Sequence, residues 1–235
     1  MKKGIILSAF ILSAIVFAGF SSGQSVVTET RDEKGFTKVS FGVSGNLYIN
    51  LGPEFKVVIE GDKSILDDIL TEVSGGRLVI KKENWRMNFN EKVTVTITMP
   101  ELIGLGVSGS GKAEIRDAVK TSDLSLNVSG SGKLYTTDLT LSNLNCGISG
   151  SGDIVIGGNG KSGTADISIS GSGNYTGEQL KIGSAQVSIS GSGNCNCNVT
   201  ESLKGSISGS GNLTYLGNAP KVDTRVSGSG HVRSR

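Results

Sequence analysis

Apolar and polar residues alternate along the second half of the chain in blocks that repeat about every twenty residues. Taking the first serine of a recurrent Ser-Gly-Ser-Gly motif as the centre of each block, the preceding residue is always Val or Ile. Apolar residues also prevail three and five positions before this serine and five and seven positions after it. Side chains in a strand point alternately to its two faces. These odd spacings predict two strands per block, with apolar side chains facing a shared interior and polar ones facing solvent.

The motif itself has a nearly constant period. Its seven copies begin at Ser108, Ser129, Ser149, Ser170, Ser190, Ser208 and Ser227. Successive copies lie 21, 20, 21, 20, 18 and 19 residues apart. A period of this size is typical of a solenoid, in which each coil contacts only its neighbours. Because two such strands in line would be unusually long, we expect the chain to bend at the motif, with the glycines inward and the serines outward.

A third, weaker apolar side follows each pair of strands, for example at Leu139 and Leu141 and at Leu180 and Ile182. Three short sides per coil suit strands that pair in register with the coils above and below. We therefore predict an all-β fold: a right-handed parallel β-helix, or solenoid, with coils of about 20 residues and one short N-terminal helix.

The first hundred residues follow the repeat less closely. Phe41 to Ile49 resembles a degenerate first coil, with Ser-Gly-Asn in place of the full motif. Asp62 can begin a helix that ends at Gly75-Gly76. Its apolar face would consist of Ile65, Leu66, Ile69, Leu70 and Val73. A helix this short must pack on the stack of coils, either as an insert or as a lid.

The N-terminus has the pattern of a secretory signal. Lys2 and Lys3 precede an apolar run from Ile5 to Phe20, and small residues precede a cleavage point before Gln24. The alternative is an uncleaved membrane anchor. We divide the chain into a signal peptide at 1–23, a flexible segment at 24–35 and one β-helical domain at 36–235. Within that domain we expect irregular coils at 36–100 and regular coils at 101–235. The protein would then be exported to the periplasm, the cell surface or the medium.

The net charge of the chain argues against one class of function and indicates no other. The full sequence holds 23 Lys and Arg against 21 Asp and Glu, and removing Lys2 and Lys3 with the signal leaves 21 of each. A neutral mature chain argues against nucleic-acid binding through a general positive field.

Few residues suggest catalysis or metal binding. Cys146, Cys195 and Cys197 could form a disulfide or a metal site, but all three occupy inward positions, so we expect free thiols in the core. His231 is the single histidine, which excludes a histidine triad and a zinc site built from several histidines. The aspartates fall at different positions of the repeat and form no row. We expect no catalytic residue, metal or cofactor; the alternative is a polysaccharide-cleaving enzyme with an acid–base pair assembled from loops.

Several segments in order resemble the bacterial family named for the head GIN domain of auto-transporter adhesins. They are Gly42–Ile49, Val57–Asp62, Gly76–Ile80 and the recurrent Val/Ile-Ser-Gly-Ser-Gly. The resemblance runs from about Phe36 to the C-terminus. It implies a secreted or envelope-located β-helical domain, found in Bacteroidetes-like bacteria, without enzyme activity. The membrane barrel of a true auto-transporter is not evident in this sequence.

The function expected from these observations is non-catalytic binding of a glycan or a surface protein. The alternative is a periplasmic structural or signalling module, and the chain could also form a homo-oligomer. Aromatic side chains contribute most per residue to interfaces. The candidate partner contacts are the aromatic residues expected at the surface: Tyr48, Trp85 and Tyr135.

Overall fold

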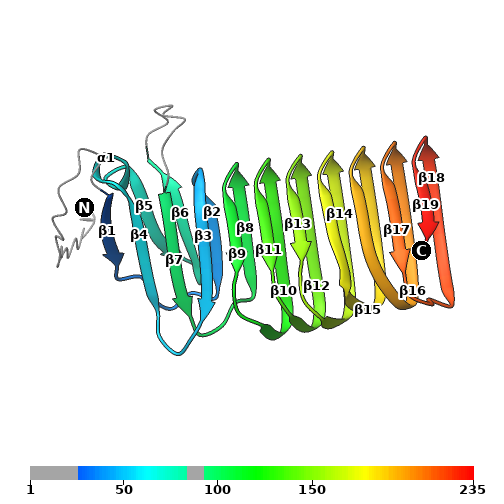
Figure 1. The fold of residues 1–235 in the computed structure, drawn as a ribbon, viewed down its shortest axis with the longest axis horizontal. Helices are drawn as coiled ribbons and strands as arrows, with labels where there is room; N and C mark the ends of the chain where they lie inside the picture. Colours follow the sequence, from blue (N-terminus) through cyan, green and yellow to red (C-terminus); the bar gives the residue numbers. More distant parts are fainter. Residues whose placement is uncertain (1–25, 84–92) are drawn as a thin grey trace, which may run out of the picture.

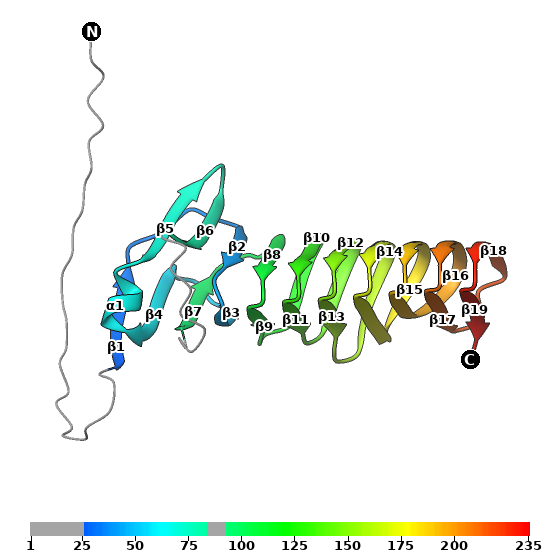
Figure 2. The same ribbon diagram turned by 90° about the horizontal axis from the view of Figure 1, so that it is seen from above.

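The structure, a computed structural model, describes residues 26–83 and 93–235. All of its strands belong to one 19-stranded sheet, which winds into a β-solenoid of about seven turns with coils about 20 residues apart. Figures 1 and 2 show the coils stacked along one axis. The prediction of an all-β solenoid with one short helix is therefore confirmed.

Each regular coil consists of one strand before the motif, the bend, and one strand after it. The strands of this region are β8 (Gly104–Gly109), β9 (Lys112–Ile115), β10 (Val119–Gly130), β11 (Lys133–Thr136), β12 (Leu139–Gly150), β13 (Asp153–Ile156), β14 (Gly160–Gly171), β15 (Asn174–Gly191), β16 (Asn194–Gly209), β17 (Asn212–Leu216), β18 (Lys221–Gly228) and β19 (His231–Ser234). Strands β15 and β16 each run from one motif to the next, without a break at the third side of the coil.

The coils form two facing walls, which Figure 2 shows from above. The pre-motif wall contains β8, β10, β12, β14, the second halves of β15 and β16, and β18. The post-motif wall contains β9, β11, β13, the first halves of β15 and β16, β17 and β19. Pairing is parallel and in register, so that equivalent residues of successive coils lie side by side; Ser129, for example, pairs with both Ser108 and Ser149.

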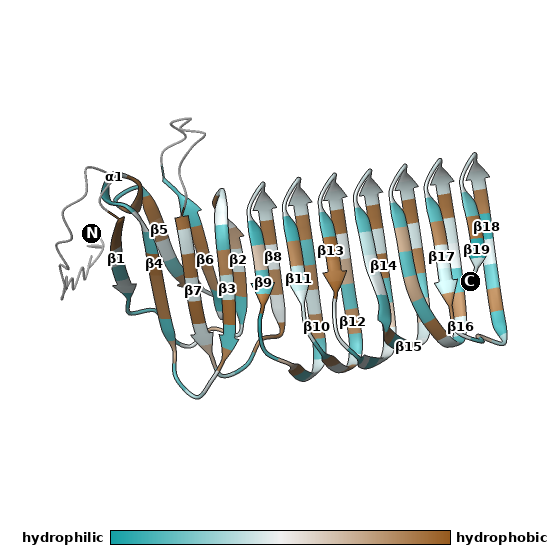
Figure 3. Ribbon diagram, in the orientation of Figure 1, coloured by the Kyte–Doolittle hydropathy of each residue, from teal (hydrophilic) through white to brown (hydrophobic). Residues whose placement is uncertain are grey.

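The core lies between the walls. The Val or Ile before the motif is buried in every coil except the last, as are most residues at the other predicted inward positions. Figure 3 shows the resulting apolar bands continuing from coil to coil. Burial of each Val, Leu or Ile side chain contributes about 1.5–3 kcal/mol to the stability of the fold. Each coil packs against the coils on either side of it, so a coil on its own would leave part of its apolar surface exposed.

The two glycines of the motif differ in conformation. The first has a positive φ in every copy, between 85° and 125°, a region that favours glycine. The second is buried in the first six copies, and the serines are exposed. At the bend, backbone hydrogen bonds continue from coil to coil: the Ser151 amide donates to the Gly130 carbonyl at 2.8 Å. The predicted bend is confirmed, although the first glycine is half-buried in five copies and exposed in the first and the last, so it does not face fully inward.

The N-terminal region starts the stack and then covers its end. Its elements are β1 (Val26–Arg31), β2 (Lys38–Gly42), β3 (Gly45–Leu51), β4 (Lys56–Asp62), α1 (Lys63–Leu66), β5 (Ile69–Ser74), β6 (Arg77–Lys82) and β7 (Val93–Met99). Strands β2 and β3 pair in parallel with β8 and β9, which places them in the first coil. Strand β4 pairs antiparallel with β1 and β7, and β5 pairs antiparallel with β6.

Two N-terminal predictions need correction. The sequence predicts a flexible segment at 24–35, but its residues Val26–Arg31 form β1 and pair along their whole length with Val57–Asp62 of β4. The helix does begin at Asp62, whose side chain accepts a hydrogen bond from the Ser64 amide at 3.0 Å, but it ends at Leu66. The remainder forms a hairpin that turns at Gly75 and Gly76, both with positive φ.

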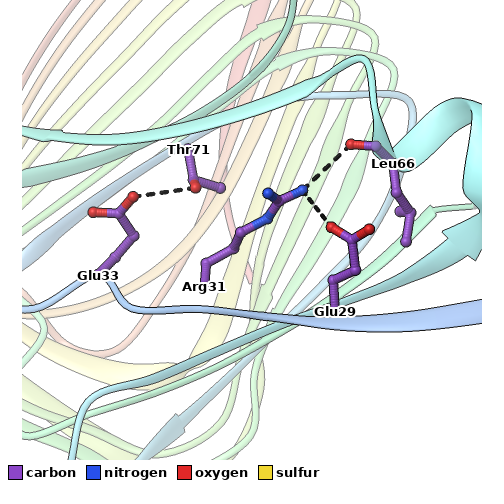
Figure 4. Close-up of polar contacts among 5 residues, drawn as sticks. All are labelled: Glu29, Arg31, Glu33, Leu66 and Thr71. Carbon is purple, nitrogen blue, oxygen red and sulfur yellow. Dashed lines mark hydrogen bonds and ion pairs between the residues drawn. The ribbon is translucent and has the colours of Figure 1, made fainter. Parts of the chain in front are cut away.

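Polar contacts hold β1 against this end of the solenoid (Figure 4). One Arg31 Nη atom forms an ion pair with Glu29 at 2.7 Å and donates to the Leu66 carbonyl at 3.3 Å. The Thr71 hydroxyl donates to the Glu33 carboxylate at 3.2 Å. These contacts join the N-terminal segment to α1 and β5. Across residues 26–83 and 93–235, no helix has the length and apolar character to cross a membrane.

Candidate functional site

A continuous chain of side-chain hydrogen bonds runs along the outer surface of the post-motif wall. It occupies the position four residues after the first serine of the third to the sixth motif. Asn174 donates to Asp153 at 2.8 Å, Asn194 donates to Asn174 at 2.9 Å, and Asn212 donates to Asn194 at 2.9 Å. We call these four residues the amide ladder. The amides of Asn174 and Asn194 each donate one hydrogen bond and accept another. The ladder therefore spans four coils, and every asparagine in it donates toward the N-terminal end of the stack.

The in-register pairing of the coils produces this ladder. Neighbouring strands lie about 4.8 Å apart, which is the distance at which stacked Asn side chains can bond one another. Asn174 pairs with Asp153 on one side and with Asn194 on the other, and Asn194 pairs in turn with Asn212. Asn174 and Asn194 are thus each fixed by a neighbour on either side, which presents an ordered row of amide groups to solvent.

Asp153 ends the ladder as an anion. Its second oxygen forms an ion pair with Lys133 at 3.0 Å. Partial burial of the Asp153 carboxyl opposes ionisation, but the hydrogen bonds from Asn174 and Lys133 outweigh it and hold the pKa below its ordinary value. The hydrogen bond to Asp153 raises the pKa of Lys133. Both groups are therefore charged at neutral pH.

The four ladder residues line a shallow groove of about 680 Å³. The side chains around the ladder include hydroxyls, charged groups, a further amide, one aromatic ring and one valine. The residues that line the groove are Lys133, Tyr135, Asp153, Val155, Asn174, Thr176, Asn194, Asn196, Asn212, Thr214 and Arg233. The groove follows the solenoid axis across the coils, is predominantly polar, and has Asp153 as the only carboxylate among its lining residues.

Two of the three predicted contact residues lie on this same wall. Tyr48 of β3 and Tyr135 of β11 occupy one outward row, with Glu114 of β9 paired to both. The Arg116 guanidinium lies 3.6 Å from the centre of the Tyr48 ring, and the Lys112 ammonium lies 4.7 Å from that of Tyr135. Cations therefore cover part of both rings. Trp85, the third predicted contact, lies outside the described residues.

The pre-motif wall carries a second, less continuous polar surface. Asn143 donates to Asp123 and Thr164 donates to Asn143, both at 2.9 Å, and Ser202 donates to Ser184 at 2.8 Å. No hydrogen bond between Thr164 and Ser184 joins these groups in the described structure. The depression above them has a volume of about 740 Å³. The motif serines nearby line a smaller one of about 350 Å³.

The cysteines lie in the core, as their inward positions predicted. All three are buried free thiols, and the fully buried Tyr175 is close to them. Burial raises the pKa of the Cys146 and Cys195 thiols. Within the part of the chain that the structure describes, no group of three or more His, Cys, Asp or Glu side chains is arranged to hold a metal ion.

Comparison with known proteins identifies the fold. The family model described as "Putative auto-transporter adhesin, head GIN domain" matches residues 35–219. The chain belongs to this family. This GIN domain also superposes on a solved structure from Bacteroides fragilis, titled a putative adhesin, with a TM-score of 0.85 and 26% identity over 92% of this chain and 100% of that one.

Two Parabacteroides distasonis structures share the fold of this GIN domain. One, titled a putative adhesin, has a TM-score of 0.73 and 21% identity over 90% of this chain and 98% of its own. The other, titled a putative lipid binding protein, has a TM-score of 0.69 and 23% identity over 91% of this chain and 98% of its own. At these identities the likeness shows the fold alone. No curated protein matches the chain.

Proposed function

We propose that this GIN domain is a non-catalytic, envelope-located binding module that holds a glycan chain along its post-motif wall. The amide ladder carries this proposal. Because Asn174 and Asn194 each bond a neighbour on either side, their amides are held in place before any ligand arrives, which reduces the entropy lost on binding. A row of fixed amides next to Thr176 and Thr214 offers repeated donors and acceptors, as the hydroxyl groups of a linear polysaccharide require.

The other residues of the groove support a sugar ligand. Tyr135 provides an aromatic edge and Lys133 and Arg233 provide cations, so a glycan that carries some acidic groups would fit best. The family description as an adhesin and the predicted signal peptide agree with a position at the cell envelope. A lipid chain fits less well, because most of the residues that line the groove are polar.

The geometry argues against cleavage of that glycan. Glycosidases commonly use two carboxyl groups on either side of the scissile bond, and one of them must be protonated. Asp153 is the one carboxylate that lines this groove, and its lowered pKa keeps it ionised at neutral pH. The ion pair with Lys133 also occupies one of its oxygens.

The test is retention of the mature chain on a glycan array that includes acidic and neutral linear polysaccharides. Asn194→Ala interrupts the ladder at its centre and Tyr135→Ala removes the aromatic edge, so both should lower retention at least tenfold. Asn143→Ala is the matched control, because it removes an Asn from a hydrogen-bonded group on the opposite wall.

Equal retention by all three variants would contradict the placement of the site. Release of reducing ends from any retained polysaccharide would contradict the non-catalytic assignment. Retention of an envelope protein by the wild-type chain, with no glycan retained, would replace the proposed ligand by a protein.

A further inference from the structure

The last coil of the solenoid presents an open edge. None of the residues that the structure describes pairs with the far side of β18 or β19. Val222 is 42% exposed and Val226 is 43% exposed, whereas Leu203 and Ile207, their partners in the previous coil, are 2% and 1% exposed. Figure 1 shows β18 and β19 at this end and β1 and α1 at the other. Within the described ranges, strand β1 also pairs on one side only, with β4, and Val26 is 73% exposed, but the β18 edge exposes two valines whose partners in the previous coil are buried.

An edge of this kind favours the addition of another strand. Lys221–Gly228 is an eight-residue strand whose outer main-chain groups have no partner strand among the described residues, and two valines on its inner face lack a covering layer. Strand addition would satisfy the main-chain groups and bury the valines together. The remaining question is which strand fits.

The sequence of β18 is complementary to itself in the antiparallel direction. If Thr224 of one copy lies opposite Thr224 of another, Val222 faces Val226 and Asp223 faces Arg225. Residues directly opposite in an antiparallel pair share a face of the sheet. Both valine pairs would therefore extend the core, while both Asp–Arg pairs would lie on the outer face with opposite charges in contact.

We propose that two copies of this chain associate through their β18 strands, antiparallel and centred on Thr224. The arrangement has two-fold symmetry, so it is complete at two copies and leaves neither β18 edge open. Addition of the edge to the N-terminal end of another copy would instead continue as an open chain of molecules. The proposal is independent of glycan binding, because the amide ladder has no role in the contact.

A charge exchange tests this register. Asp223→Arg and Arg225→Asp each place like charges opposite one another at two positions of the contact. Each should weaken self-association about tenfold or more. The double variant Asp223→Arg/Arg225→Asp restores opposite charges and should restore association. Arg225→Asp is the cleaner single variant, because its partner in the previous coil is Ser206, whereas Asp223 pairs with Lys204.

The measurement is the molar mass of the mature chain by light scattering during size-exclusion chromatography over a range of concentrations. Lys120→Asp, an exposed charge reversal in the middle of the stack, is the control and should leave the mass of the dimer unchanged. Thermal unfolding verifies that every variant is folded. A wild-type chain that stays monomeric at all concentrations, masses that rise beyond two copies, or a double variant that remains dissociated would each overturn the proposal.

Discussion

Individual glycine residues determine where each coil turns. From the second copy of the motif onward, the first glycine combines a positive φ with a close approach of the neighbouring coil: a Cβ at Gly150 would lie 2.5 Å from the Gly130 carbonyl oxygen. The alternation of side chains along a strand predicted that these glycines face inward and the serines beside them face outward. The sign of φ was beyond that prediction, because a period of two says which face a residue occupies and nothing about its backbone angles.

Gly150→Val should therefore destabilise the fold far more than Ser151→Ala. The valine adds both backbone strain and an overlap with Gly130, which together cost about 2–5 kcal/mol. Ser151 is exposed, and its replacement should change the free energy of unfolding by less than about 0.5 kcal/mol. Urea unfolding of the two variants measures the difference. Equal unfolding midpoints would mean that glycine has no special role at the bend.

At the scale of elements, the same residue spacing can suit two structures. The apolar positions from Ile65 to Val73 fit a helix, yet Ile69 and Val73 also fit a strand, and the hairpin satisfies its main-chain groups by pairing with β6. Gly75 and Gly76 end either element.

The sequence analysis did not predict the amide ladder, although the pattern that indicates it is present in the sequence. Asp153, Asn174, Asn194 and Asn212 share one position of the repeat, and a comparison of the aspartates alone does not include the three asparagines.

The ion pair at the start of the ladder makes stability depend on pH. The folded-state pKa of Asp153 is lowered, so its contribution is present above the ordinary carboxyl pKa and is lost as the pH falls through the folded value. The pKa of Lys133 is raised, so its contribution is lost only as the pH rises above its ordinary value of 10.5. Between these limits the pair stabilises the wall.

Asp153→Asn tests this dependence, because the asparagine keeps an oxygen for Asn174 and loses the ion pair. The wild type should unfold at a higher urea concentration than the variant at neutral pH, and the difference should disappear in acid. Unfolding curves at a series of pH values provide the measurement. A difference that persists unchanged down to about pH 2 would show that charge is not its cause.

At the scale of the whole molecule, the three cysteines report whether the stack opens. They lie within the middle coils, so a thiol reagent reaches them only when the walls separate. We expect none of the three to react appreciably in the native state and all three to react in denaturant, because their thiols are buried and those of Cys146 and Cys195 have raised pKa values. Mass spectrometry of the labelled chain counts the modified thiols. Rapid labelling without denaturant would indicate local opening of the middle coils.

The positions of β1 and β19 have a mechanical consequence. These strands lie at opposite ends of the stack, so tension between them acts along the solenoid axis, in the direction of the hydrogen bonds that join one coil to the next (Figure 1). The load then falls on the hydrogen bonds between one pair of neighbouring coils at a time. A chain under load should lengthen in discrete steps of roughly 70 Å, the extended length of one coil. Under a sudden pull, such a domain would yield gradually and dissipate the load over several small events.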